Sequence, residues 1–202
     1  MITLFAPRMA THKLEKIVFL SDCKKFYENI KQSFAKHGIT DPSETLFEMR
    51  PTELPKAAAL VNSSKAYFTK QVEAARRESD PEHTVYISTR RGIYTNAEDA
   101  HFETVITMLV YKATTIYEEG KGGHIPADCV ATLRSLTPGD YQFGSDGFAV
   151  KINDVIAKAY PTEVTDTWNW CLHEKFGQVD LRGQGVLVIQ HVVDQLVQNL
   201  DK

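Results

Sequence analysis

Residues 16 to 38 read KIVFLSDCKKFYENIKQSFAKHG, and this stretch decides the fold class. Lys16 to Ser21 is a short apolar run rich in β-formers, which is typical of a buried strand. In the segment that follows, Phe26, Ile30 and Phe34 recur at helical spacing. Gly38, a residue type that commonly ends a helix, comes shortly after them. The stretch therefore predicts a strand, a turn and a helix, as in α/β folds.

The rest of the chain continues this alternation. We predict further strands at Thr45 to Met49, at Thr84 to Ser88, twice within Val105 to Tyr117, and at Phe148 to Ile152. We predict helices at Lys56 to Glu78, from Pro126 through Leu136, at Asn153 to Ala159 and at Val186 to Leu200. Arg90, Arg91 and Gly92 are interpreted as a strand end or turn. Together these segments predict a single domain, residues 1–202, of the α/β class, with a mixed β-sheet covered by helices.

The composition excludes several classes of protein. A formal net charge of −3 with mixed signs gives no basic field for nucleic acid or anionic lipid, so we expect no nucleic-acid partner. The three cysteines lack the spacing of zinc sites or of a disulfide framework, which favours a reducing compartment. The chain shows neither a signal peptide nor a transmembrane segment of about 20 apolar residues. We therefore expect a soluble, cytoplasmic protein.

Two short patterns suggest chemistry that the sequence then excludes. His101-Phe102-Glu103, followed by PADC, echoes zinc deaminases, but that metal site needs two thiolates three residues apart. We expect Phe102 to begin a buried strand, with His101 and Glu103 facing solvent. Cys171 and His173 alternate on a segment that we interpret as extended, so their side chains would diverge. The nearby Trp168 and Trp170 are interpreted as core residues.

Glycines at 177, 183 and 185 lie just before the final predicted helix, in the segment FGQVDLRGQG. A glycine-rich turn that leads into a helix binds phosphate through free backbone amides, and Arg182 would add positive charge. The segment matches neither a P-loop nor the dinucleotide-binding fingerprint. Phosphate binding and a plain structural turn both stay open.

The segment SDCKK, residues 21–25, directly follows the first predicted strand. It resembles the (S/T)-N-x-x-K turn of inosine/xanthosine triphosphatases, with Asp22 in the asparagine place and Lys25 in the lysine place. A helix ending in VEAARRES and the following VYISTRRGIY resemble that family's next strand and its IE(A/G)GI turn. The resemblance implies an inosine triphosphate pyrophosphatase-like fold. It also implies a purine-nucleotide site that includes Ser21, Asp22 and Lys25.

A second resemblance covers most of residues 16–200. The segments HFETVITMLVYK, IPADCVATLRSLTPGDYQF and GFAVKINDVIAKAYPTEVTDTWNWCL are similar to the C-terminal domain of the vertebrate proline-rich coiled-coil protein one, in the same superfamily. The pattern SLTPxDY, from Ser135 to Tyr141, is the most specific piece. This resemblance implies a regulatory role, a protein partner such as a regulatory subunit of the cyclic-AMP-dependent kinase, and an association with the early secretory pathway.

The resemblance also identifies a missing acid. In the triphosphatases the acid of IE(A/G)GI holds Mg²⁺ against the phosphates, whereas Arg90 stands in that place here, and a guanidinium cannot bind a metal. In the acid-rich loop, Pro51 to Pro55, Glu53 is the one match as a metal ligand. We therefore expect a non-catalytic binding or regulatory protein without a cofactor. Arg90 and Arg91 would bind phosphate without metal, or would merely solvate a strand end.

The alternative is a Mg²⁺-dependent hydrolase of inosine or xanthosine triphosphate that uses Glu53 or Asp22. Because the family's site joins the two matched turns, we expect Asp22 and Lys25 to lie near Arg90 at the rim of the main cleft. We also expect a homodimer, with the apolar run Val105 to Val110 in its interface.

Overall fold

The computed structural model describes residues 14–21, 23–40, 44–50, 60–78, 82–142, 147–161 and 163–200. Within these residues, six strands form one sheet in the order β2-β1-β3-β4-β5, and β6 pairs with β4. The strands are β1 (Lys16–Leu20), β2 (Leu46–Arg50), β3 (Thr84–Thr95), β4 (His101–Tyr111), β5 (Thr114–Glu119) and β6 (Gly123–His124). The helices are α1 (Lys24–Ala35), α2 (Val61–Arg76), α3 (Ala127–Ser135), α4 (Ile152–Ala159), α5 (Thr167–Trp170), the π-helix η1 (Cys171–Lys175) and α6 (Leu181–Leu200).

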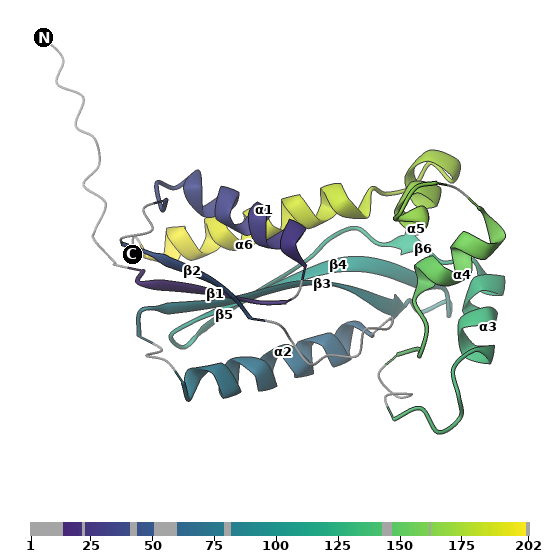
Figure 1. The fold of residues 1–202 in the computed structure, drawn as a ribbon, viewed down its shortest axis with the longest axis horizontal. Coiled ribbons are helices and arrows are strands. Elements are labelled where there is room, and N and C mark those ends of the chain that lie inside the picture. Colours follow the sequence, from purple (N-terminus) through teal and green to yellow (C-terminus); the bar gives the residue numbers. More distant parts are fainter. Residues whose placement is uncertain are drawn as a thin grey trace, which may run out of the picture.

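The sheet is mixed, and helices cover both of its faces. β1 runs parallel to β2 and to β3, while β3, β4 and β5 are antiparallel neighbours. Figure 1 shows α1 and α6 on one face and α2 on the other. This confirms the predicted mixed sheet covered by helices. The two strands predicted within Val105 to Tyr117 are also confirmed, as β4 and β5.

Each face of the sheet buries its own apolar cluster. Ile17, Phe19 and Ile87 pack with α1 and α6, and their neighbours Val18 and Tyr86 pack with α2. This division follows from the strand geometry, because successive side chains of a strand point to opposite faces. β1 is therefore apolar from Ile17 to Leu20, as a strand buried on both faces must be.

β3 is longer than the sequence predicts. The strand does not end at Ser88 but continues for twelve residues in all, through Arg90 and Arg91, and it pairs with β4 from Val85 to Thr95. Gly92 marks a close approach instead of a turn. A Cβ atom at this position would lie 2.9 Å from Cγ2 of Val61, so α2 packs directly against the β3 backbone there.

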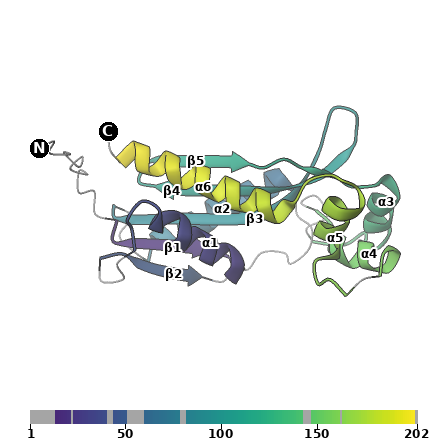
Figure 2. The same ribbon diagram turned by 90° about the horizontal axis from the view of Figure 1, so that it is seen from above.

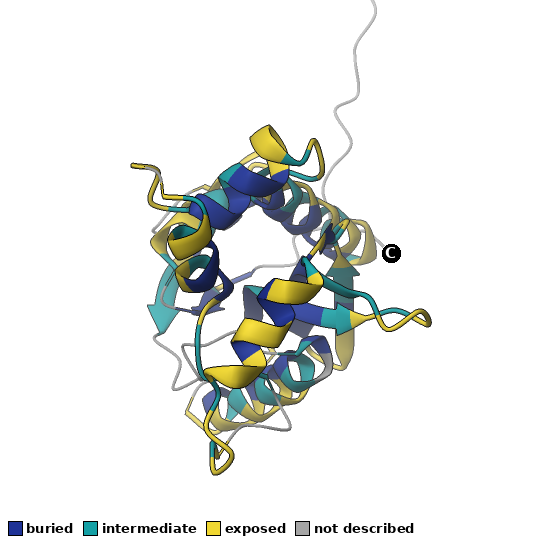
Figure 3. Ribbon diagram, turned by 90° about the vertical axis from the view of Figure 1, so that its right-hand side faces the viewer, coloured by how far each residue is buried: buried dark blue, intermediate teal, exposed yellow. Residues whose placement is uncertain are grey.

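Beyond the end of β1, the elements α3, α4, α5 and η1 form a helical lobe (Figures 1 and 2). The lobe packs around the far ends of β3 and β4 and the first turns of α6, with Trp168, Cys171 and Leu181 completely buried in its core. Viewed from this end, the helices turn buried sides inward and exposed sides outward (Figure 3). The lobe core therefore continues the sheet core along β3, β4 and α6.

Three sequence expectations are wrong in this lobe. The segment predicted as a strand from Phe148 holds bends at Ala149 and Val150 before α4 begins at Ile152. Cys171 and His173 lie on the π-helix η1, not on an extended segment, although only Cys171 is buried. α6 begins at Leu181, five residues earlier than expected, because Asp180 caps it: its carboxylate accepts the N–H of Arg182 at 3.0 Å.

The expected dimer interface is also wrong. Every residue from Val105 to Val110 is buried within the chain, at the centre of the sheet. A homodimer thus stays a prediction without an assigned surface. Among the described residues, no helix combines the length and the apolar character that crossing a membrane requires.

Candidate functional site

The turn between β1 and α1 carries the first of the expected site residues. Ser21 is buried, and its hydroxyl accepts the N–H of Cys23 at 3.2 Å. Within the described residues, Cys23 occupies the N-cap position without a capping hydrogen bond from its side chain. Lys24 and Lys25 follow as exposed residues, and the first turn of α1 contains no acidic residue. Two lysines therefore lie at the positive end of the helix dipole.

Arg90 and Arg91 point to opposite faces of β3. Arg90 lies opposite Ile106, which belongs to the cluster under α2, and its Nε donates to Ser88 Oγ at 3.2 Å. Lys25 lies on α1, which covers the other face. The expected grouping of Lys25 with Arg90 is therefore wrong. Since β3 continues as a paired strand, alternation separates Arg90 from Arg91, and it is Arg91 that shares a face with α1.

Arg91 belongs to a group of side chains that we call the junction cluster: Arg91, Glu103, Asp166, Trp168 and Arg182. Glu103 and Trp168 are buried, and the other three are partly exposed. The guanidinium of Arg91 donates to both Asp166 oxygens, at 2.6 and 3.3 Å, and lies 3.9 Å from Glu103. Arg182 Nε donates to the same Asp166 carboxylate at 3.1 Å. The indole N–H of Trp168 donates to Glu103 at 2.8 Å. Two expected site residues, Arg91 and Arg182, are thus brought together on one carboxylate.

Burial and charge oppose each other in this cluster. Burial raises the pKa of Glu103 to about 7, although Arg91 and the Trp168 hydrogen bond act in the opposite direction. Burial also raises the pKa of Asp166, but the hydrogen bond and charge of Arg91 outweigh it, so the net change is a lowered pKa. For Arg91, burial would lower the pKa, yet Glu103 and Asp166 leave it raised. Asp166 is therefore the ionised partner of both arginines, and Glu103 titrates near neutrality.

The sequence interpretation missed Glu103. We expected its side chain to face solvent, but only 6% of the residue is exposed. The signal was present in the period-two pattern of strand β4. Glu103 shares its face with Val105, Thr107 and Leu109, all of which are buried. An acidic residue in such a row of buried positions is itself expected to be buried.

Of the two uses left open for the glycine-rich segment, the structure shows no open phosphate-binding turn among its described residues. Gly183 and Gly185 lie inside α6, and the N–H of Arg182 is taken by Asp180 and by Asn169 Oδ1, at 3.0 and 3.3 Å. Arg182 reaches Asp166 instead of an open turn. Asp22 and Glu53 lie outside the described residues. In the part of the chain that the structure describes, no three His, Cys, Asp or Glu side chains are grouped to hold a metal ion.

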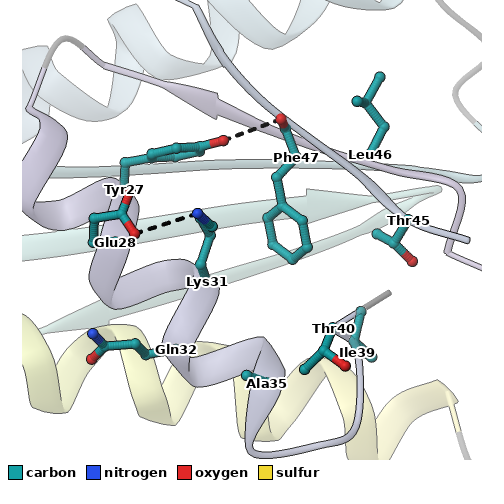
Figure 4. Close-up of a pocket in the computed structure, with 10 residues that line it drawn as sticks. All are labelled: Tyr27, Glu28, Lys31, Gln32, Ala35, Ile39, Thr40, Thr45, Leu46 and Phe47. Carbon is teal, nitrogen blue, oxygen red and sulfur yellow. Dashed lines mark hydrogen bonds and ion pairs between the residues drawn. The ribbon is translucent and has the colours of Figure 1, made fainter. Parts of the chain in front are cut away.

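A groove lies elsewhere, between α1 and the edge strand β2 (Figure 4). Its volume is about 460 Å³, and Tyr27, Ile39 and Phe47 supply much of its apolar wall. The Tyr27 hydroxyl donates to the Phe47 carbonyl at 3.1 Å across the groove. No described residue of the predicted site lines this groove.

Comparison with known proteins adds a fold and no function. No family model matches the chain, and no curated protein matches it. Among solved structures, the chain is similar to protein VC0702 from Vibrio cholerae, with a TM-score of 0.60 and 10% sequence identity. The alignment covers 92% of this chain and 97% of VC0702, so the similarity extends over the whole fold.

Proposed function

We propose that this chain is a non-catalytic regulatory protein that binds a phosphate-bearing ligand at the turn between β1 and α1. The observation that carries the proposal is the N-terminus of α1. Acidic residues stabilise the first turn of a helix and lysines destabilise it, yet this first turn holds Lys24 and Lys25. A bound phosphate would reverse that unfavourable arrangement, because helix N-termini bind anions through their free amides. The prediction that the ligand contains a purine comes from the sequence resemblance alone.

The position of the turn supports the same proposal. It lies at the carboxyl end of β1, the edge where open α/β sheets bind their ligands. Beyond that end, β3 continues without β1 beside it but still paired with β4, and it places Arg90 and Arg91 on its two faces.

The described residues at this edge do not fit a magnesium ion. Mg²⁺ requires oxygen ligands, usually carboxylates. Here Arg90 and Arg91 carry guanidinium groups, which cannot bind a metal, and the Ser88 hydroxyl donates to the Leu20 carbonyl at 2.9 Å. Arg91 is already paired with Asp166, so the proposed anion contacts come from the N-terminus of α1 and Lys25. We therefore propose ligand binding without metal-dependent hydrolysis, and Arg90→Glu should not by itself create an active hydrolase.

Calorimetry of the full chain with inosine triphosphate tests this proposal, with EDTA present throughout. We expect binding without metal and no release of pyrophosphate when Mg²⁺ is added back. Lys25→Gln should weaken binding several-fold, whereas Lys31→Gln is a matched control, because Lys31 lies on the exposed side of the same helix beside Glu28. Absence of binding would contradict the proposal. So would turnover of about 1 per second that chelation abolishes, which would support the hydrolase.

A protein partner, such as a kinase regulatory subunit, stays a prediction from the second resemblance. Pull-down of the purified chain with that subunit, with and without inosine triphosphate, tests whether the ligand regulates a protein contact.

A further inference from the structure

The junction cluster is where the helical lobe meets the sheet through polar contacts. Arg91 and Glu103 belong to strands β3 and β4, whereas Asp166 and Trp168 belong to the start of α5. Two hydrogen-bonded contacts cross from one side to the other: Arg91 with Asp166, and Trp168 with Glu103. Moving α5 away from the sheet would break both of them. The same movement would bring Glu103 into water.

The charges of the cluster balance in only one protonation state. With Glu103 ionised, two guanidiniums face two carboxylates, and the cluster is neutral. With Glu103 protonated, Arg91 and Arg182 share Asp166, and one positive charge is in excess. Burial nevertheless holds the proton on Glu103, because it raises the pKa of this carboxyl to about 7. Desolvation therefore outweighs the attraction of Arg91.

Every neighbouring element contributes to this balance. Arg91 faces Glu103 from β3, Trp168 faces it from α5, and Asp166 repels its negative charge from the segment before α5. The charge of Arg182, on α6, reaches Asp166. At the outer side, Asn169 Nδ2 donates to Asp180, the cap of α6, at 3.0 Å. The cluster is thus a built arrangement of four elements around one titrating carboxyl.

We propose that the helical lobe loosens from the sheet when Glu103 loses its proton, so that the junction cluster makes the position of the lobe depend on pH. The sign follows from linkage. The closed arrangement binds the proton more tightly than an opened one, in which Glu103 is solvated and returns to the ordinary carboxyl pKa of 4.5. The stabilisation of the closed arrangement by protonated Glu103 is therefore fully present below pH 4.5. It is lost as the pH rises through about 7. The largest change in the opening equilibrium is about 300-fold.

This inference does not depend on a ligand at α1. It requires only that burial of Glu103 be lost when the lobe moves. Proton-linked loosening and phosphate binding can therefore fail independently of each other.

The indole N–H of Trp168 reports the state of Glu103 directly, because it donates to that carboxyl. We would record the ¹⁵N–¹H indole signals of the full chain from pH 5.5 to 9, with Trp170→Phe to assign the two signals. In parallel, hydrogen exchange would give the protection of amides in α5 and η1 relative to amides of β4 in the same sample. The ratio cancels the intrinsic pH dependence of exchange.

We expect the Trp168 signal to titrate with a midpoint near 7, and the protection ratio to fall as the pH rises past that midpoint. Glu103→Gln keeps an acceptor for Trp168 but cannot ionise, so both profiles should become flat. Glu98→Gln, an exposed change in the β3–β4 turn, should leave both profiles as in the unmodified chain. A Trp168 signal that does not move, or one that titrates while the protection ratio stays constant, would overturn the proposal. The unmodified chain alone decides this, even if Glu103→Gln fails to fold.

Discussion

The sheet core and the junction cluster lie on the same few strands, but apolar packing stabilises the first and charged contacts stabilise the second. Between α1, α6 and the sheet, the buried side chains are aromatic or aliphatic, as at Phe19, Phe34 and Ile87. A little further along the same strand, Arg91 joins the buried Glu103 and the partly buried Asp166 in a group of charges. Apolar burial is insensitive to pH, whereas a buried carboxyl is not. One strand thus links a pH-independent core with a pH-dependent one.

The largest expected effect tests the apolar side of this comparison. Phe34→Ala removes a ring that is completely buried between α1 and the sheet, and it should lower the free energy of unfolding by about 3–5 kcal/mol. Urea unfolding at pH 5.5 and at pH 8.5 should give the same loss. Phe34→Leu is the control, with a smaller loss because it keeps most of the volume. A loss that changes strongly with pH would contradict the assignment of this region as purely apolar.

The second effect tests the charged side. Arg91→Met leaves Asp166 with Arg182 alone and leaves Glu103 without its cation, which should cost about 3 kcal/mol at pH 8.5. At pH 5.5 the loss should be smaller, because Glu103 is already protonated below its pKa of about 7 and only Asp166 loses a partner. Urea unfolding at both values measures the difference. The exposed Arg77→Met should change the stability by less than about 0.5 kcal/mol. Equal losses at the two pH values would show that Glu103 does not titrate in this range.

The smallest expected effect concerns a polar contact at the edge strand β2, far from the junction cluster. Tyr27→Phe removes the hydroxyl that binds the Phe47 carbonyl, while the ring keeps its stacking on Phe19. The expected loss is about 1 kcal/mol, the usual net value of one hydrogen bond. Urea unfolding of the variant, together with hydrogen exchange of the β2 amides, measures it. A loss well above 2 kcal/mol would mean that the groove edge, like the junction, depends on polar contacts.

The sequence was sufficient where one physical signal acted alone. The run after Lys16 and the helical spacing of Phe26, Ile30 and Phe34 predicted β1 and α1 because burial alone sets both periods. In the same way, the density of β-branched residues within Val105 to Tyr117 predicted the strands β4 and β5. The mixed sheet covered by helices followed from these elements.

The sequence was insufficient where a residue type has two structural uses. Gly92 suggested a turn, but its missing side chain makes room for Val61 on α2, a contact between distant segments. The sequence predicts that Arg90 and Arg91 form one charged end of a strand. Because the pairing with β4 continues, their side chains lie on opposite faces of the sheet. The partner of Arg91, Asp166, lies 75 residues away along the chain. Nothing local to either residue specifies such a pair.

Helix α6 runs from the junction cluster to the C-terminal end of α1. α6 has twenty residues and is therefore about 30 Å long, as long as a small domain is wide. Its first turn carries Arg182 to the junction cluster, and Asp194, further along, binds His37 just beyond α1 at 2.7 Å. Between these two contacts, buried residues such as Ile189 and Val193 hold α6 against the sheet. The lobe and the C-terminal end of α1 are therefore fastened to one continuous element.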